Sequence, residues 1–364
     1  MRIVYLTDRL DRRGGAAAHL RQVVTWAVSG GHRVTVAAGS FAAPPPEGVE
    51  AVRVRGLGTA VASPAGLARL GPLLASHDVI HVQNVMNPVA LERAAATGRA
   101  VVTVQDHRFF CPGPGRTLPD GRPCRAVMSE AACAACLADG GYRARMLALT
   151  AARLASVRGA RVVVLSGYMQ RELEQAGLPD AVVIPPWIEP GPGREGPGRT
   201  FLLAGRLVAH KAPEDGWRAW REAGTPLPLE VAGSGPLASA LEGARRLGWL
   251  DPPAFDEAIR RARAVLFPAR WQEPFGIAGM EALARGVPVI VAESGGVAEW
   301  ARVGCLRVAP GDVDAMAEAI RRLAEDPDLA VRLGREGRRH VLERFSRARI
   351  APRLEAVYRL ARSP

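Results

Sequence analysis

Residues 185–200 read PPWIEPGPGREGPGRT and contain five prolines and four glycines. Proline lacks the backbone donor that helices and inner strands need, and glycine loses the most entropy on ordering, so this density excludes regular structure. The stretch therefore predicts a linker. A chain of 364 residues is long enough for two or three domains. The linker therefore predicts one domain before it and one after it, and the fold of each is predicted from its own sequence.

Short β-branched runs alternate with alanine-rich stretches on both sides of this linker. The runs that predict strands are RIVYL, HRVTVAA, VIHV, AVVTV and RVVVLS before it, and TFLLAG, PLEVAGSG, AVLFP, VPVIVA and CLRVA after it. Alternation of strands with helices implies crossover connections and parallel sheets covered on both faces. We therefore predict an α/β protein with a first domain over residues 1–185, a linker over 186–199, a second domain over 200–345, and a C-terminal helix over 346–364 that returns to the first domain.

The charge of the chain is concentrated in its first half. Of the net charge of +12, residues 1–185 carry +8, from 21 arginines against 13 acidic residues. This excess favours an anionic acceptor, a membrane surface or nucleic acid, with simple arginine bias as the alternative. No arginine run with interleaved aromatic residues occurs, which argues against nucleic acid.

The chain contains no stretch of about 18 uncharged apolar residues, the length that a membrane-spanning helix needs. Its start, MRIVYLTDRLDRR, lacks the apolar segment and small-residue cleavage site of a signal peptide. We therefore expect a cytoplasmic protein, and peripheral contact with the inner face of the membrane stays open.

The chain has a single lysine, Lys211, among 48 basic residues. It lies in GRLVAHKAPEDG, directly after the predicted strand TFLLAG, with Gly205 and Arg206 at the end of that strand. Lysine is a flexible point charge and arginine a planar fork, so two such cations at a strand's exit suit a diphosphate. The alternative is a residual lysine on a solvated turn.

A second stretch, WQEPFGIAGMEALARGVPVIV, combines two acidic residues with the start of a helix. The helix is predicted over roughly Phe275 to Arg285, and the amides of Gly276 and Ile277 at its N-terminus suit an anion. Glu273 and Glu281 suit the sugar hydroxyls that would flank that anion. The alternative is a buried glutamate paired with an arginine.

A third stretch, AESGGVAEW, follows the next predicted strand, and its Gly295 and Gly296 supply a tight turn with free amides. In this order, GRLVAHK, VAGSGP, EPFGIAGMEALARGVPVI and GGVAE resemble the GT-B retaining glycosyltransferases of family 4. The Glu–seven–Glu motif of that family falls on Glu273 and Glu281. In the first half, TDRLDRRGGAAAHL resembles the family's glycine-rich acceptor loop, and SGYMQRELEQAGLPDAVVIPP resembles its approach to the linker.

This resemblance implies the GT-B fold, in which two Rossmann-like domains face a cleft. It also implies a hexosyltransferase that uses a nucleotide-sugar donor, a UDP-sugar in preference to a GDP-sugar, with no cofactor required for transfer. The acceptor stays open among carbohydrate, lipid-linked and natural-product compounds.

The resemblance also implies roles for the donor-site residues. Arg206 and Lys211 would bind the diphosphate, and Glu273 would contact donor-sugar hydroxyls with help from the amides of residues 275–277. Glu281 would hold the ribose.

In the first domain, Gly14 and Gly15 would let the first loop approach the donor phosphate and the acceptor. The histidine that many relatives carry after the strand AVVTV contacts the donor sugar, but here its position falls on Gln105 within VVTVQDHRFFCPG. Either Gln105 replaces it, or His107, two residues later, takes its role. His107 as an ordinary loop histidine is the third alternative.

Four of the five cysteines cluster in one segment, residues 111–136, as Cys111, Cys124, Cys133 and Cys136. The segment is rich in glycine and proline, so it predicts a loop that needs an external clamp. Four thiols that end in C-x-x-C favour a structural zinc in a cytoplasmic protein. Disulfide or redox use, and unligated thiols, are the alternatives.

Two other function classes stay open beside the transferase. One is a GT-B epimerase or hydrolase that cleaves nucleotide-sugars without an acceptor. The other is a non-catalytic module that binds nucleotides or nucleic acid through the basic first half. An NAD(P)-linked oxidoreductase is disfavoured because no G-x-G-x-x-G follows the opening strand RIVYL.

Overall fold

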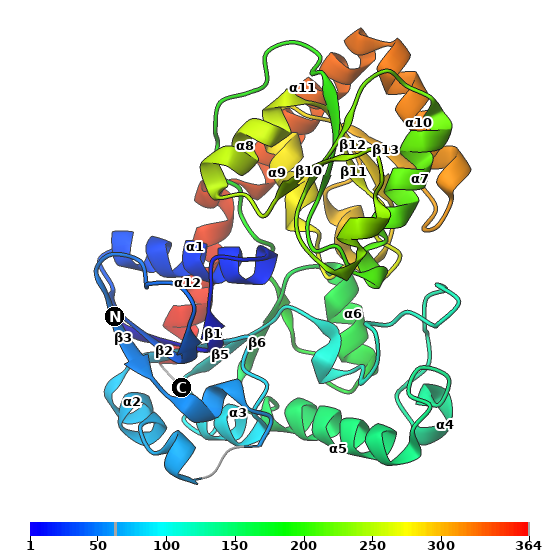
Figure 1. Ribbon diagram of the computed structural model, residues 1–364. Coiled ribbons are helices and arrows are strands. Elements are labelled where there is room, and N and C mark those ends of the chain that lie inside the picture. The colour runs from blue at the N-terminus through cyan, green and yellow to red at the C-terminus, as the bar shows by residue number, and fades with distance from the viewer. Residues whose placement is uncertain (62–63, 363–364) are drawn as a thin grey trace. The chain divides into compact units, whose positions relative to one another are not determined.

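The computed structural model describes residues 1–61 and 64–362 and divides the chain into two compact units (Figure 1). The first unit comprises Met1–Pro119, Cys124–Pro185 and Ala351–Pro364, and the second comprises Asp120–Pro123 and Pro186–Ile350. Each unit is built on one parallel sheet with helical crossovers. The predicted α/β class, with two parallel-sheet domains, is confirmed.

The first sheet has the order β3-β2-β1-β4-β5-β6-β7, and all of its strand pairs are parallel. Its strands are β1 (Arg2–Leu10), β2 (Arg33–Phe41), β3 (Val49–Arg53), β4 (Val79–Gln83), β5 (Ala100–Val104), β6 (Arg161–Val164) and β7 (Val182–Val183). The sequence did not predict the edge strands β3 and β7. The first is largely exposed and the second is only two residues long, so neither shows a buried apolar run.

The second sheet has the order β10-β9-β8-β11-β12-β13 and is also parallel. Its strands are β8 (Thr200–Ala204), β9 (Leu229–Ala232), β10 (Arg245–Gly248), β11 (Ala262–Phe267), β12 (Val289–Ala292) and β13 (Cys305–Val308). The sequence missed β10 because it reads RRLG. Residues 186–199 contain neither helix nor strand, apart from an isolated bridge between Ile188 and Ser346.

The helices connect the strands and then form the C-terminal part of the chain. They are α1 (Gly15–Ser29), α2 (Leu70–Ser76), α3 (Pro88–Ala95), α4 (Glu130–Cys133), α5 (Gly140–Ser156), α6 (Gly167–Gln175), α7 (Pro213–Ala223), α8 (Pro252–Arg261), α9 (Ile277–Ala284), α10 (Val313–Glu325), α11 (Pro327–Phe345) and α12 (Arg347–Arg362). Short 3₁₀ turns include η3 (His107–Phe109), η4 (Ala209–Lys211) and η6 (Gly295–Glu299). In the second unit, α7 and α10 pack side chains against the core of the sheet.

Alternation along the first sheet divides its side chains between two faces. Alternate residues of the inner strands, such as Leu6 and Val82, join the apolar core that also contains side chains of α2, α3 and α5. Their neighbours Tyr5 and His81 face α12, where the Tyr358 hydroxyl lies 2.5 Å from Nδ1 of His81 and 3.0 Å from the Tyr5 hydroxyl. Thr103 completes this buried polar row, with its hydroxyl 2.7 Å from Nε2 of His81.

Each sheet order contains one point where the chain reverses direction across the sheet. In the first sheet it lies between β1 and β4, and in the second between β8 and β11. Open parallel sheets bind ligands outside the carboxyl ends of their strands at such a point. The loops after these strands are therefore where functional residues are to be sought.

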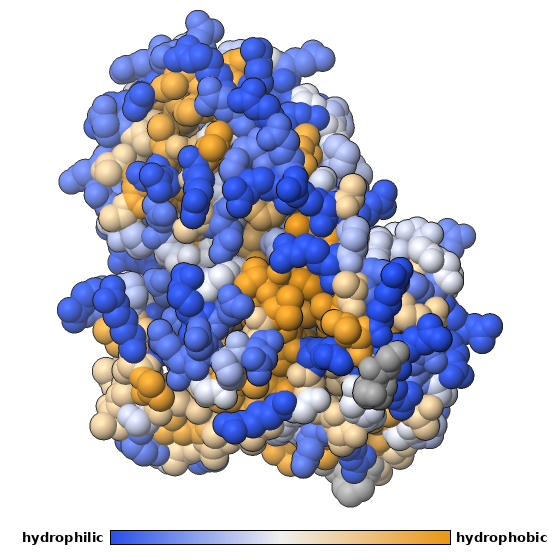
Figure 2. All heavy atoms as spheres, turned by 180° about the vertical axis from the view of Figure 1, so that it is seen from behind, coloured by the Kyte–Doolittle hydropathy of each residue, from blue (hydrophilic) through white to orange (hydrophobic). Residues whose placement is uncertain are grey.

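Figure 2 shows mostly hydrophilic side chains in the upper part of the view, and apolar side chains gathered in its middle and lower parts. Among the described residues, no helix is both long enough and apolar enough to span a membrane.

Changing Tyr358 to Phe tests the buried row that fixes α12 on the first sheet. Removal of the hydroxyl leaves Nδ1 of His81 and the Tyr5 hydroxyl without this partner, and burial, which lowers the pKa of His81 to about 3, prevents the imidazole from becoming charged instead. We expect a loss of about 1–3 kcal/mol in the free energy of unfolding, measured by urea denaturation.

Tyr142→Phe is the matched control, because Tyr142 is exposed on α5. Its free energy of unfolding should change by less than about 0.5 kcal/mol. Equal stability of the Tyr358→Phe variant and the wild type would show that the buried row does not stabilise the fold.

Candidate functional site

Two loops that flank the reversal point of the second sheet meet through an ion pair. Lys211 ends η4, in the loop after β8, and Glu273 lies in the loop after β11. The Lys211 ammonium donates to Oε1 of Glu273, and the exposed fractions of the two side chains are 25% and 4%. The Lys211 Nζ also lies 4.9 Å from the centroid of the Trp271 ring, a cation–π distance. The single lysine thus has a counter-ion within the protein and keeps part of its surface open.

Arg206 lies beside this pair and is held by a neutral histidine. Its Nη2 is 3.4 Å from Nε2 of His210, whose ring packs on Trp271 with centroids 4.6 Å apart. Desolvation, followed by the charges of Arg206 and Lys211, lowers the pKa of His210 to about 4. The imidazole is therefore neutral at pH 7, so its Nε2 is able to accept a hydrogen bond from the guanidinium group of Arg206.

A second ion pair fixes the loop that carries Glu273. Arg270 donates from Nε to Oδ2 of Asp215 at 2.5 Å and from Nη2 to Oδ1 at 2.8 Å, a bidentate arrangement between that loop and α7. The backbone amides of Arg270 and Trp271 also donate to the carbonyl of His210. The loop after β8, together with the first turn of α7, is therefore joined to the loop after β11 by several hydrogen bonds.

The helix that follows Glu273 begins without a side-chain cap. Gly276 has a φ of 84°, which favours glycine, and α9 starts at Ile277 with no acidic residue in its first turn. Phe275 is buried, and its carbonyl accepts the indole proton of Trp300 at 2.6 Å. The predicted anion site at this N-terminus stays a prediction, and no acidic side chain of the first turn opposes it.

The Gly295–Gly296 turn differs from the prediction of free amides. The amide of Gly296 donates to the Glu273 carbonyl at 2.6 Å, and that of Gly295 donates to Oε1 of Gln272 at 3.1 Å. A Cβ built on Gly295 would lie 2.4 Å from the Glu273 carbonyl oxygen, and its φ is 56°. Only glycine fits there, and these amides support the loop of Glu273 instead of facing a ligand.

Glu281 lies on α9, and its side chain is partly buried. Burial raises its pKa to about 7, although the charge of Arg285 acts in the opposite direction. An acid with this pKa is about half ionised at neutral pH. It is therefore suited to hydrogen bonding as donor or acceptor, as a ribose contact would require.

In the first unit, three buried polar side chains meet near the reversal point. Gln83 ends β4, Gln105 follows β5, and His19 lies on α1. Nδ1 of His19 is 2.5 Å from Nε2 of Gln105 and 3.3 Å from Nε2 of Gln83. Burial lowers the pKa of His19 to about 4, so its Nδ1 accepts.

The carbonyl oxygens of these two glutamines have no hydrogen-bond partner among the described residues. Buried acceptors without donors are rare in folded proteins. The Oε1 atoms of Gln83 and Gln105 suit hydroxyl donors of a ligand. His19 and Gln83 were missed from the sequence, because each reads as an ordinary member of a helix or a strand.

His107 and Gln105 do not meet the same neighbours. His107 is 2% exposed in η3, with Nε2 3.1 Å from the Tyr168 hydroxyl and its ring packed on Phe110. Gln105 contacts His19 of α1, whereas His107 contacts Tyr168.

Gly14, with a φ of 88°, precedes α1, which begins at Gly15.

The structural zinc predicted for the cysteine segment is not supported. In residues 1–61 and 64–362, no group of three or more His, Cys, Asp or Glu side chains could hold a metal ion. Cys111, Cys124, Cys133 and Cys136 are free thiols. The clamp that the loop needs is Arg116, whose guanidinium pairs with Glu172 at 2.5 Å and also donates to the Ala126 carbonyl.

Three residues around Lys211 were not predicted from the sequence. His210, Asp215 and Arg270 carry no motif of their own, and only the fold brings them together. Their proximity to Lys211 along the chain was the one available signal for His210 and Asp215.

Two family profiles match consecutive parts of the chain. The one described as Glycosyltransferase Family 4 matches residues 13–191, and the one described as Glycosyl transferases group 1 matches residues 188–340. The match covers both units in the order that the fold shows.

Relatives with curated names match part of the chain. A glycogen synthase of Mycobacterium tuberculosis is 30% identical over 184 residues, which are 46% of this chain and 44% of the relative. A D-inositol 3-phosphate glycosyltransferase of Streptomyces avermitilis is 38% identical over 165 residues, which are 38% of this chain and 35% of the relative. The chain thus spans less than half the length of these two relatives.

Solved structures match over almost the whole chain. Anabaena HepE in complex with UDP and glucose has a TM-score of 0.70 and 17% identity, and covers 97% of this chain and 98% of its own. WaaG, a glycosyltransferase involved in lipopolysaccharide biosynthesis, has a TM-score of 0.71 and 15% identity, with 98% and 99% covered. At such identities the likeness shows the fold, and with the two family profiles it leads to one assignment. The chain belongs to the GT-B glycosyltransferases of family 4.

Proposed function

We propose that this protein is a retaining glycosyltransferase that transfers a sugar from a nucleoside-diphosphate sugar, a UDP-sugar in preference to a GDP-sugar, to a hydroxyl acceptor. The observation that carries the proposal is the placement of Lys211 and Arg206 around Glu273 at the reversal point of the second sheet. Structures of similar fold contain UDP, with glucose in one case, which favours the uridine donor.

The cations would act on the leaving group. When the bond between the anomeric carbon and the diphosphate breaks, negative charge grows on the diphosphate oxygens and positive charge grows on the sugar. Arg206, at the open side of the loop, would grip oxygens as a fork, and Lys211 would neutralise from the other side. Lys211 is positioned by Glu273 and Trp271 before the ligand arrives, so its charge needs little reorganisation in the transition state.

The acceptor hydroxyl would attack from the face that the diphosphate leaves. Its oxygen forms the new bond to the anomeric carbon, and its proton passes to an oxygen of the departing phosphate. Glu273 would orient donor hydroxyls through the part of its carboxylate that Lys211 does not occupy, and Glu281 would hold the ribose. In the first unit, the Oε1 of Gln105 would accept a sugar hydroxyl, the role that relatives give to a histidine.

Lys211→Ala should lower kcat/KM for donor turnover by about 10²–10³-fold, because a charge partner of the leaving group is lost. Donor consumption and product release are measured with UDP-sugars, with and without an added acceptor. Lys211→Arg should restore little, since the fork cannot occupy the point-charge position between Glu273 and Trp271.

The loss of Lys211 also leaves the buried carboxylate of Glu273 unpaired, so thermal stability must be measured in parallel. Arg245→Ala is the control for the loss of a cation beside a buried glutamate outside the site, because Arg245 pairs with Glu230, which keeps Arg261 as its second partner. The control should keep wild-type turnover. If Lys211→Ala loses stability but keeps turnover, Lys211 has only a structural role and the diphosphate assignment is wrong.

Glu281→Gln should raise stability at pH 8 and weaken UDP binding. The pKa of Glu281 rises from an ordinary value of 4.5 to about 7, so the folded state binds the proton more tightly than the unfolded state. Stability that depends on this carboxyl is therefore full at low pH and falls as pH rises between about 4.5 and 7. The variant avoids this loss, so its melting temperature should exceed that of the wild type by a few degrees at pH 8.

The two melting temperatures should converge near pH 4.5, where the wild-type carboxyl is neutral. UDP should raise the melting temperature of the variant less than that of the wild type at pH 8, because the neutral amide offers one acceptor oxygen, whereas the carboxylate offers two charged oxygens that accept ribose hydroxyls more strongly. An unchanged UDP effect would argue against the ribose contact. A constant difference between the proteins at all pH values would argue against the raised pKa.

A further inference from the structure

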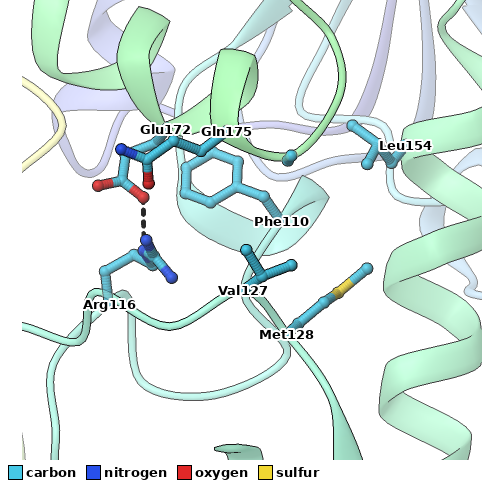
Figure 3. Close-up of a pocket in the computed structure, with 8 residues that line it drawn as sticks. Phe110, Arg116, Val127, Met128, Leu154, Glu172 and Gln175 are labelled. Carbon is cyan, nitrogen blue, oxygen red and sulfur yellow. Dashed lines mark ion pairs between the residues drawn. The ribbon is translucent and has the colours of Figure 1, made fainter.

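A pocket of about 130 Å³ opens in the first unit, beside the Arg116–Glu172 ion pair, and none of the three residues of the glutamine cluster lines it. Figure 3 shows Val127 and Met128 of the cysteine-rich segment below Phe110, Leu154 of α5 to the right of it, and Glu172 and Gln175 of α6 to the upper left. Glu172 and Arg116 lie together at one end. The pocket thus has a largely apolar body and one polar end.

Its size and its lining limit what it can hold. Engineered apolar cavities of about 150 Å³ bind benzene, so a space of this volume accepts one aromatic ring or a short branched chain, and not a long lipid chain. Phe110 and Leu154 are buried side chains that a ring would contact without any loss of polar interactions. Val127, in contrast, is 66% exposed, so the rim of the pocket presents apolar surface to water. A ligand that covers this surface would gain binding free energy from its burial.

The polar end is built before any ligand binds. Arg116 is 7% exposed, Glu172 is 13% exposed, and Nε of Arg116 lies 2.5 Å from Oε2 of Glu172. The Arg116 amide also donates to Sγ of Cys111 at 3.4 Å, and its guanidinium donates to the Ala126 carbonyl. Because the two charges cancel, a charged ligand group would compete with an existing partner, whereas a neutral group would leave the pair intact.

The pocket also borders the chain segment that carries a proposed site residue. Phe110 lies five residues after Gln105, directly after η3. A molecule held by the pocket would therefore contact Phe110, at the end of the segment that begins with Gln105 and its unpaired Oε1.

We propose that this pocket binds the aromatic or branched aliphatic group of a neutral acceptor alcohol. The identification of this molecule as the acceptor rests on the proposed function, while occupation of the pocket does not. The proposal names the acceptor class as a hydroxyl compound with one compact apolar group, in contrast to a charged or wholly polar acceptor.

The test uses 3-fluorobenzyl alcohol as the probe and the full-length protein. Ligand-observed fluorine NMR should give a Kd on the order of 1 mM, the range expected for so small a ligand. The methyl signals of Met128 and Leu154 should shift with the same Kd. Glycerol, which has hydroxyls but no ring, and 3-fluorobenzoate, which is charged, should bind at least 10-fold more weakly.

Val127→Trp fills the rim of the pocket at an exposed position, so it should fold, and it should weaken probe binding at least 10-fold. Val89→Trp is the control, because Val89 is 41% exposed on α3 and does not line the pocket. With a donor present, formation of the fluorobenzyl glycoside should fall in Val127→Trp by the same factor. Donor hydrolysis without the alcohol should stay at the wild-type rate in both variants.

The possible results distinguish three claims: that the pocket binds the probe, that the bound alcohol is the acceptor, and that the protein is a glycosyltransferase. Absence of probe binding, or binding that Val127→Trp leaves unchanged, would overturn the pocket proposal. Binding in the pocket with donor hydrolysis but no glycoside would overturn the acceptor assignment. Absence of all donor turnover in the wild type would overturn the proposed function, and the binding results alone would then decide whether the pocket holds an apolar alcohol.

Discussion

The Lys211–Glu273 ion pair is the interaction on which the second unit's site depends. It joins the loop after β8 to the loop after β11, the two strands between which the chain reverses across the sheet. Around it, Asp215–Arg270 fixes the same two loops a second time, and the amide of Gly296 holds the carbonyl of Glu273. A nearly buried carboxylate needs such a partner, so the pair stabilises the loops and orients the charges in one arrangement.

The arginines of this chain have a structural task for which the single lysine is not suited. Many arginines bind backbone carbonyls inside the units: Arg194 donates to four of them, and Arg263 to three. Arg153, 4% exposed, donates to the Met86 carbonyl. A planar fork with five donors suits that task, and a compact ammonium does not. Part of the net charge of +12 is therefore internal scaffolding, which reduces its weight as evidence for an anionic partner.

The sequence predicted the fold well wherever strands were buried on both faces. Central strands such as β4 and β11 are continuous apolar runs and were found, while β3, β7 and β10 escaped because edge strands need no such run. Site residues followed a similar division. Lys211 and Glu273 could be found from local motifs, but their direct contact could not, because they are separated by 62 positions. The partners His210 and Arg270 act only through contacts that the folded chain creates.

The cysteine segment is a loop for which the sequence suggested a zinc clamp that the described residues do not support. A loop rich in glycine and proline does need a clamp, and four thiols suggested zinc. The clamp is instead Arg116, a nearly buried arginine whose backbone has a φ of 58°, uncommon for a residue other than glycine. Its guanidinium reaches the Ala126 carbonyl across the loop and Glu172 on α6, so one side chain closes the loop and attaches it to the unit. Because that attachment uses paired charges at one end of an otherwise apolar space, the same residue that orders the loop also shapes the pocket beside it.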